Sequence, residues 1–176
     1  FLKHVRASRS NRAKTAMIQE AQHRAPILPA QLDRHPGLLN TPGGVLDLEC
    51  GVLKQHSASL FLSKMTHVEY LDKMACPLWE AFLADIFDHD QALMAYVQAA
   101  VGYSLTGYTT EQCAFFCYGA GRNGKSTFLD TLSDILGDYA VNIQPDTLMV
   151  RPAGATNSDI ARLKGARYVT STEPNE

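Results

Sequence analysis

Apolar residues recur at helical spacing in two neighbouring segments in the middle of the chain. Pro77 suits a first helical turn, because the position needs no backbone N–H donor. The residues that follow at i, i+3, i+4, i+7 and i+8 predict one wide apolar face: Trp79, Phe82, Leu83, Ile86 and Phe87. An aromatic face of this kind is typical of a core, so we expect no ligand role for Trp79. A second helix follows, capped by Asp88 or Asp90 and stopped by Gly102.

Other stretches of the chain predict shorter elements. A first helix is expected from about Ser10 to His23, with its alanines and Met17 inward, and T-H-V-E from Thr66 is a possible helix-capping box. Glycine pairs and alternating apolar residues predict a hairpin within residues 38–55. Later in the chain we expect a strand at 139–143, a helix from Thr156 to Lys164 ended by Gly165, and a strand from Arg167.

The most specific pattern begins with the uncharged, mostly apolar run Cys113 to Tyr118, which predicts a buried strand. The run leads into G-A-G-R-N-G-K-S-T at residues 119–127, and helically spaced apolar residues follow from Phe128. Strand, glycine-rich loop and helix in this order are typical of a loop that binds the phosphates of a nucleoside triphosphate. The nine residues predicted to bind the nucleotide are Gly119, Ala120, Gly121, Arg122, Asn123, Gly124, Lys125, Ser126 and Thr127.

The residue types in this loop suit phosphate chemistry. Glycines at 119, 121 and 124 let the backbone N–H groups approach phosphate oxygens, and the following helix directs its positive end at the same oxygens. Lys125 is predicted to act on the β- and γ-phosphates, and the Ser126 hydroxyl to ligate Mg²⁺. The expected ligands are therefore ATP and Mg²⁺.

An acidic residue at the end of a later strand would complete such a site. R-Y-V-T-S-T, which starts at Arg167, ends at Glu173, about fifty residues after the loop. A carboxylate at this position can hold magnesium or polarise the attacking water, so we expect Glu173 to be catalytic and metal-binding, with Glu176 as a weaker candidate.

Composition and charge exclude several other classes of protein. The chain of 176 residues is 45% apolar and 19% charged, with a net charge of −2, as in ordinary globular domains. No apolar run is long enough for a transmembrane helix, and we expect no membrane partner. The four cysteines form no C-x-x-C pair, which disfavours a zinc site and fits a reducing, intracellular setting. Cys113 and Cys117 are expected to pack as small apolar groups.

Basic residues gather at the start of the chain, and two interpretations of them stay open. The first 24 residues contain six basic side chains and one acid, Glu20: the basic residues are Lys3, Arg6, Arg9, Arg12, Lys14 and Arg24. They could contact nucleic-acid phosphates, or form the solvated face of the first helix. The solvated face is the simpler interpretation.

These blocks, taken in order, resemble the phage and plasmid primase–helicase family, whose motor belongs to helicase superfamily 3. The matching blocks are L-L-N-T-P-G-G-V-L-D-L-E-C-G-V-L, C-P-L-W-E-A-F-L, A-V-G-Y-S-L-T-G, F-C-Y-G-A-G-R-N-G-K-S-T-F-L, L-G-D-Y-A and A-R-L-K-G-A-R-Y-V-T-S-T-E-P-N-E. The resemblance implies an α/β P-loop NTPase of AAA+-like fold, present in part over 111–176. A mainly α-helical domain, with the hairpin, is expected to precede it over 1–110.

The resemblance also implies an activity and partners. The full-length protein is expected to be an ATP-hydrolysing DNA helicase in the host cytoplasm that acts as a homo-hexamer on single-stranded or forked DNA. Gly119, Gly124, Lys125 and Ser126 match the family's phosphate-binding motif, and Glu173 matches its Walker B acid. The family's sensor, DNA-contacting hairpin and arginine finger follow that acid, so we expect this segment to be a fragment that is inactive by itself.

Two other functions stay open from the sequence. A P-loop kinase of small molecules would use Lys125 and Ser126 in the same way, but it should carry an arginine-rich lid. Here the arginines at 151, 162 and 167 are scattered. The other alternative is an assembly module in which bound nucleotide joins subunits without motor activity.

Overall fold

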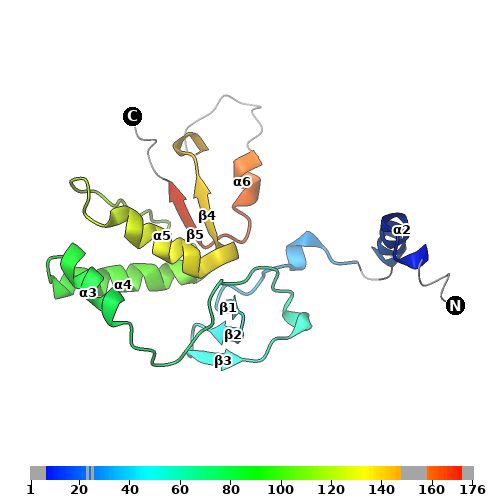
Figure 1. Cartoon of the computed structure of the whole chain (residues 1–176), viewed down its shortest axis with the longest axis horizontal. Coiled ribbons are helices and arrows are strands. Elements are labelled where there is room, and N and C mark those ends of the chain that lie inside the picture. The colour runs from blue at the N-terminus through cyan, green and yellow to red at the C-terminus, as the bar shows by residue number, and fades with distance from the viewer. Residues whose placement is uncertain (1–6, 23, 25, 148–157, 172–176) are drawn as a thin grey trace. The chain divides into compact units, whose positions relative to one another are not determined.

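The computed structural model describes residues 7–22, 24, 26–147 and 158–171, which divide between two compact units, Phe1–Leu32 and Asp33–Glu176. The first unit contains helix α2 (Asn11–Gln22) and a 3₁₀ turn at Pro29–Gln31 (Figure 1). The predicted first helix is confirmed, but its inward face is not: no residue of α2 is buried, and Met17 is 62% exposed. An apolar helical face is buried only when a second element packs on it, and sequence periodicity does not supply that element.

A three-stranded antiparallel sheet opens the second unit. Strands β1 (Leu38–Thr41), β2 (Gly44–Asp47) and β3 (Val52–Lys54) pair in sequence order, which confirms the predicted hairpin. Gly44 is required by a close backbone approach, because a Cβ at this position would lie 2.5 Å from the Lys54 carbonyl oxygen.

The two predicted central helices are present as α3 (Pro77–Ile86) and α4 (Gln91–Leu105). Asp90 caps α4, since its carboxylate accepts hydrogen bonds from the N–H groups of Ala92 and Leu93. The predicted stop at Gly102 is wrong, because α4 continues through it to Leu105. A glycine ends a helix only when it adopts a left-handed conformation, and none of the positive φ angles in the described residues belongs to Gly102.

The possible helix at T-H-V-E is also absent. The backbone N–H groups of Thr66 and His67 instead donate to the carbonyls of Asn40 and Ile135. The Thr66 hydroxyl donates to Val68 O. Bonds to distant segments therefore replace the local bonds that a capped helix would make.

Further along the chain lie α5 (Lys125–Leu136) and strand β4 (Ala140–Ile143), followed by α6 (Ser158–Arg162) and strand β5 (Tyr168–Ser171). Strands β4 and β5 pair in parallel, and α5 packs against both (Figure 1). The predicted strands at 139–143 and after Arg167 are confirmed. A helix is present where one was expected before Gly165, although its expected start, Thr156, lies outside the described residues.

The predicted strand at 113–118 is wrong. These residues have no regular secondary structure, and Phe116 and Tyr118 are 87% and 92% exposed. Cys113 and Cys117 are also exposed, against expectation. An apolar run becomes a strand only by pairing with neighbouring strands, and within the described residues the parallel sheet consists of β4 and β5 alone.

The core joins the antiparallel sheet to the end of α5. Its buried members come from both parts: Leu39 and Leu46 from the sheet, and Leu136 and Tyr139 from the end of α5 and the turn after it. Gly137 lies between these parts with a φ of 55°, and His67 approaches it so closely that a side chain at this position would collide with the His67 ring. The described residues therefore form a mixed α/β fold with small sheets, and none of their helices has the length and apolar character needed to cross a membrane.

Candidate functional site

The predicted phosphate-binding loop turns tightly between Gly119 and the start of α5. Gly119 and Gly124 have φ angles of 145° and 80°, and Arg122 is left-handed at 61°. A Cβ on Gly119 would collide with the Asn123 side-chain amide. Because the Asn123 side chain lies this close to the backbone of residue 119, glycine is needed at the first position of the loop.

Lys125 directs its ammonium group into this loop. The Nζ donates to Gly119 O at 2.9 Å, to Ala120 O at 3.2 Å and to Asn123 Oδ1 at 2.8 Å. The loop therefore curves around a positive charge, and its oxygens hold that charge in place. Asn123, one of the residues predicted to bind the nucleotide, accepts a hydrogen bond from the lysine and orients it.

Helix α5 begins at Lys125 with its N-terminal donors facing the same loop. The first hydrogen bond of the helix runs from Phe128 N to Gly124 O at 2.9 Å, and Gly124 provides no side-chain cap. Helices leave their first N–H groups without intrahelical partners. Ser126 and Thr127 lie exposed in this first turn. The first turn of α5 thus carries an ammonium group, backbone donors and exposed hydroxyls.

This donor set fits a phosphate group with its magnesium ion. An ammonium group and helix N-terminal donors suit anionic oxygens, and a serine hydroxyl is a hard ligand that Mg²⁺ accepts. Among the described residues, no group of three His, Cys, Asp or Glu side chains could hold a metal by itself. Glu173 and Glu176, the predicted acids, lie outside the described residues, so their part in the site stays a prediction.

A second polar cluster surrounds Arg167, just before β5. Its guanidinium donates to Leu105 O at 2.8 Å, to His35 O at 3.3 Å and to Leu38 O. The guanidinium carbon also lies 4.6 Å from the centre of the Tyr139 ring. Arg167 thus joins the end of α4, the segment before β1 and the turn before β4. We call this arrangement the Arg167 clasp.

Burial changes the ionisation of the groups around the clasp. Desolvation lowers the pKa of Arg167 and raises the pKa of Tyr139. The neighbouring Tyr168 hydroxyl is buried without a hydrogen-bond partner among the described residues. Burial raises its pKa to about 12. The raised pKa values keep both tyrosines protonated at neutral pH.

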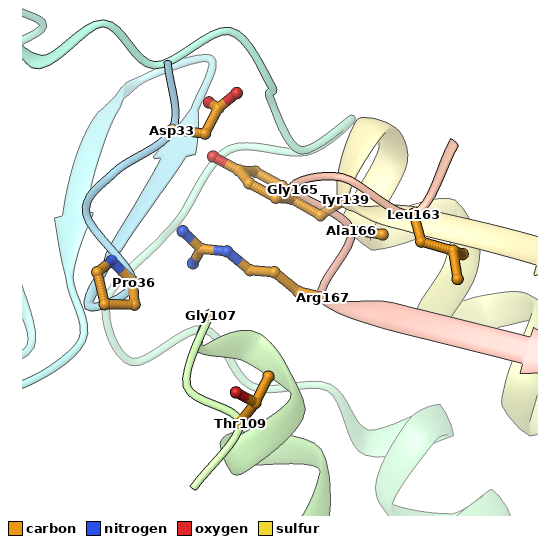
Figure 2. A pocket seen from close by; sticks show the side chains of 9 residues that line it. All are labelled: Asp33, Pro36, Gly107, Thr109, Tyr139, Leu163, Gly165, Ala166 and Arg167. Atoms are coloured by element: carbon orange, nitrogen blue, oxygen red, sulfur yellow. The ribbon is translucent and has the colours of Figure 1, made fainter. Parts of the chain in front are cut away.

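A cavity of about 320 Å³ borders the clasp (Figure 2). Its nine lining residues are Asp33, Pro36, Gly107, Thr109, Tyr139, Leu163, Gly165, Ala166 and Arg167. The main polar groups are already engaged within the chain: Asp33 accepts from the Ser63 N–H and hydroxyl, and Tyr139 Oη donates to Lys64 O. We assign no ligand to this cavity, because its polar lining is satisfied.

Sequence reasoning did not find the clasp. The sequence predicts Arg167 as the first residue of one strand and Tyr139 as the first residue of another, and it predicts no contact between them. No local pattern marks an arginine that bonds to carbonyls 62 to 132 residues away. The only available signal was a basic residue at the first position of the predicted strand.

Comparison with known proteins identifies the family. A family model described as "D5 N terminal like" matches residues 1–88, half of the chain. The chain belongs to this family, and the expected resemblance to the phage and plasmid primase–helicases is confirmed at that level, with viral proteins among the relatives.

The curated relatives are viral proteins named as helicases. "Putative helicase L207/L206" of Acanthamoeba polyphaga mimivirus is 26% identical over 178 residues, covering 97% of this chain. "Putative helicase 121R" of Invertebrate iridescent virus 3 is 29% identical over 76% of the chain. "Putative helicase 022R" of Frog virus 3 (isolate Goorha) is 31% identical over 54%. The matches span only 18%, 15% and 10% of these relatives.

Proposed function

We propose that this chain is the ATP-binding segment of an ATP-dependent DNA helicase of a viral or plasmid replication protein. The observation that supports it most directly is the Lys125 ammonium group, which the loop at 119–124 encloses at the N-terminus of α5. The names of the viral relatives support the helicase class. DNA as the partner and a homo-hexamer as the assembly belong to the same proposal.

Each residue of the loop has a distinct part in this function. Lys125 would exchange its carbonyl partners for phosphate oxygens, since the ammonium group bonds more strongly to an anion than to a neutral carbonyl. The first backbone donors of α5 would bind the same phosphate. Ser126 would hold Mg²⁺, which neutralises charge on the phosphate oxygens when bound. Glu173 is the proposed acid that orients water.

The bonds within the loop support the proposal, because they already restrict the Lys125 side chain. Three oxygens lie within 3.2 Å of Nζ, so the side chain is ordered before the ligand arrives. An ordered side chain loses less conformational entropy on binding than a mobile one. The loop glycines let the backbone approach the ligand closely.

Replacing Lys125 tests this function. Isothermal titration of the 176-residue chain with Mg-ATP should give saturable binding, and Lys125→Met should weaken it at least tenfold. Lys14→Met, in exposed helix α2, is the matched control and should bind like the wild type. Binding that is absent from the wild type, or equal in Lys125→Met, would refute the proposal.

A longer chain of the same protein separates a motor from an assembly module. If the segment belongs to a motor, Lys125→Met should abolish DNA-stimulated ATP hydrolysis and strand separation. If nucleotide serves assembly alone, the same substitution should change only the oligomeric state, measured by analytical ultracentrifugation.

A further inference from the structure

The last glycine of the predicted loop contacts helix α3. A Cβ on Gly124 would lie 2.7 Å from Ile86 Cγ2 and 3.1 Å from Phe82 Cε2. Gly124 has a φ of 80°, which side-chain-bearing residues rarely adopt. Helix α3 therefore lies directly against the backbone turn that leads into α5.

Aromatic rings extend this contact to the first turn of α5. Trp79 stacks on Phe82 at 5.3 Å between ring centroids and on Phe128 at 5.8 Å, with the second pair of planes only 8° apart. Phe87 and Phe128 form an edge-to-face pair with ring centroids 6.2 Å apart. We call the set Trp79, Phe82, Ile86, Phe87 and Phe128 the aromatic wall.

The aromatic wall takes no part in the proposed chemistry. It packs against Gly124 and includes Phe128, the residues at the two ends of the first turn of α5. Phe128 donates its backbone N–H to Gly124 O at 2.9 Å, so the ring that stacks on Trp79 belongs to the residue that closes the first turn of α5. Trp79 stacks on both Phe82 of its own helix and Phe128 of α5. These rings therefore pack α3 against the first turn of α5.

We propose that Phe82 and Ile86 are positioning residues for nucleotide binding, and that α3 sets the conformation of the Gly124 turn. This inference rests on the proposed function. Because α3 lies within residues 1–88, the segment that defines the family would be energetically coupled to the nucleotide site that follows it. A ligand that orders the Gly124 turn would also stabilise the packing of α3 against it. Equally, tighter packing of α3 would strengthen the binding of that ligand.

The coupling has an optical signature. The chain contains a single tryptophan, and Trp79 is part of the wall. Its fluorescence should change saturably when Mg-ATP binds, with the same affinity that isothermal titration gives. A tryptophan that played only a structural role away from the site would not respond.

Two substitutions in α3 test the positioning role. Ile86→Ala removes the Cγ2 methyl group that lies against Gly124 and should weaken Mg-ATP binding about tenfold. Ile86→Leu conserves volume, so it should fold, but it moves the branch away from Gly124 and should weaken binding about threefold. Leu78→Ala, also in α3 but at a residue that is 87% exposed, is the control and should bind like the wild type.

The outcomes separate this inference from the proposed function. If wild-type protein shows no Mg-ATP binding by calorimetry, the proposed function fails. If the wild type binds but Trp79 fluorescence is unchanged, or if folded Ile86→Leu and Ile86→Ala bind as tightly as the wild type, only the positioning role fails. Circular dichroism establishes folding; should Ile86→Ala be unfolded, Ile86→Leu decides the question.

Discussion

Arg167→Met removes the charged group that joins three segments of the second unit while keeping most of the apolar stem. Hydrogen bonds to charged groups contribute about 1.5–3 kcal/mol each, and Arg167 makes three to backbone carbonyls. The sum overstates the effect, because removing a buried charge also removes its desolvation penalty. We therefore expect a loss of about 3 kcal/mol in the free energy of unfolding, near the upper end for single substitutions.

Urea unfolding followed by circular dichroism measures this loss. With a slope of about 2 kcal/mol per molar urea, a loss of about 3 kcal/mol lowers the midpoint by about 1.5 M. Arg167→Lys keeps the charge but not the planar fork of donors, so it should lose about half as much. Arg34→Met, at an exposed residue that makes no hydrogen bond or ion pair within the described part of the chain, is the matched control. A shift below about 0.3 M in Arg167→Met would contradict the clasp.

Three further substitutions test other parts of the structure. Tyr139→Phe leaves the Asn40 N–H without its acceptor and should cost about 1–3 kcal/mol in urea unfolding; no change would mean that this hydroxyl is not buried in solution. Asp90→Ala removes the cap of α4 and should cost about 1 kcal/mol, with Asp72→Ala as the exposed control. Tyr168→Phe removes a buried hydroxyl that has no partner among the described residues, so stability at pH 7 should stay equal or rise by about 1 kcal/mol. In the folded chain the pKa of Tyr168 is raised from 10.0 to about 12. The unfolded chain therefore releases the tyrosine proton at lower pH, so the free energy of unfolding of the wild type should fall as the pH rises through that window. Relative to Tyr168→Phe, the fall should be up to about 1.4 kcal/mol per pH unit. Parallel pH profiles of the two proteins would refute the assignment.

Elements whose bonds are local were predictable from the sequence. The helix after Pro77 follows from its apolar spacing, and the Asp90 cap follows from a carboxylate placed before a helical run. The hairpin follows from its glycines, and the helix after the glycine-rich loop begins at Lys125 as the motif requires. In each case the residues that make the bonds lie within a few positions of one another.

The errors share one physical cause. The apolar run at 113–118 predicts a strand, but strand formation needs a partner that sequence does not provide. T-H-V-E predicts a helix start, but distant carbonyls bind its backbone donors. The first helix predicts an inward face that is not buried. In each segment the outcome therefore depended on whether a distant partner was present, which local preference does not encode.

By itself the sequence determined the residue types of the predicted phosphate-binding loop and the resemblance to primase–helicases, because both depend on adjacent residues. Only the tertiary structure decided that Arg167 joins three separate segments and that Phe82 and Ile86 contact the turn at Gly124. Those contacts join residues about 40 to 130 positions apart. No periodicity encodes such pairs, since they form only when the hydrophobic core brings the segments together.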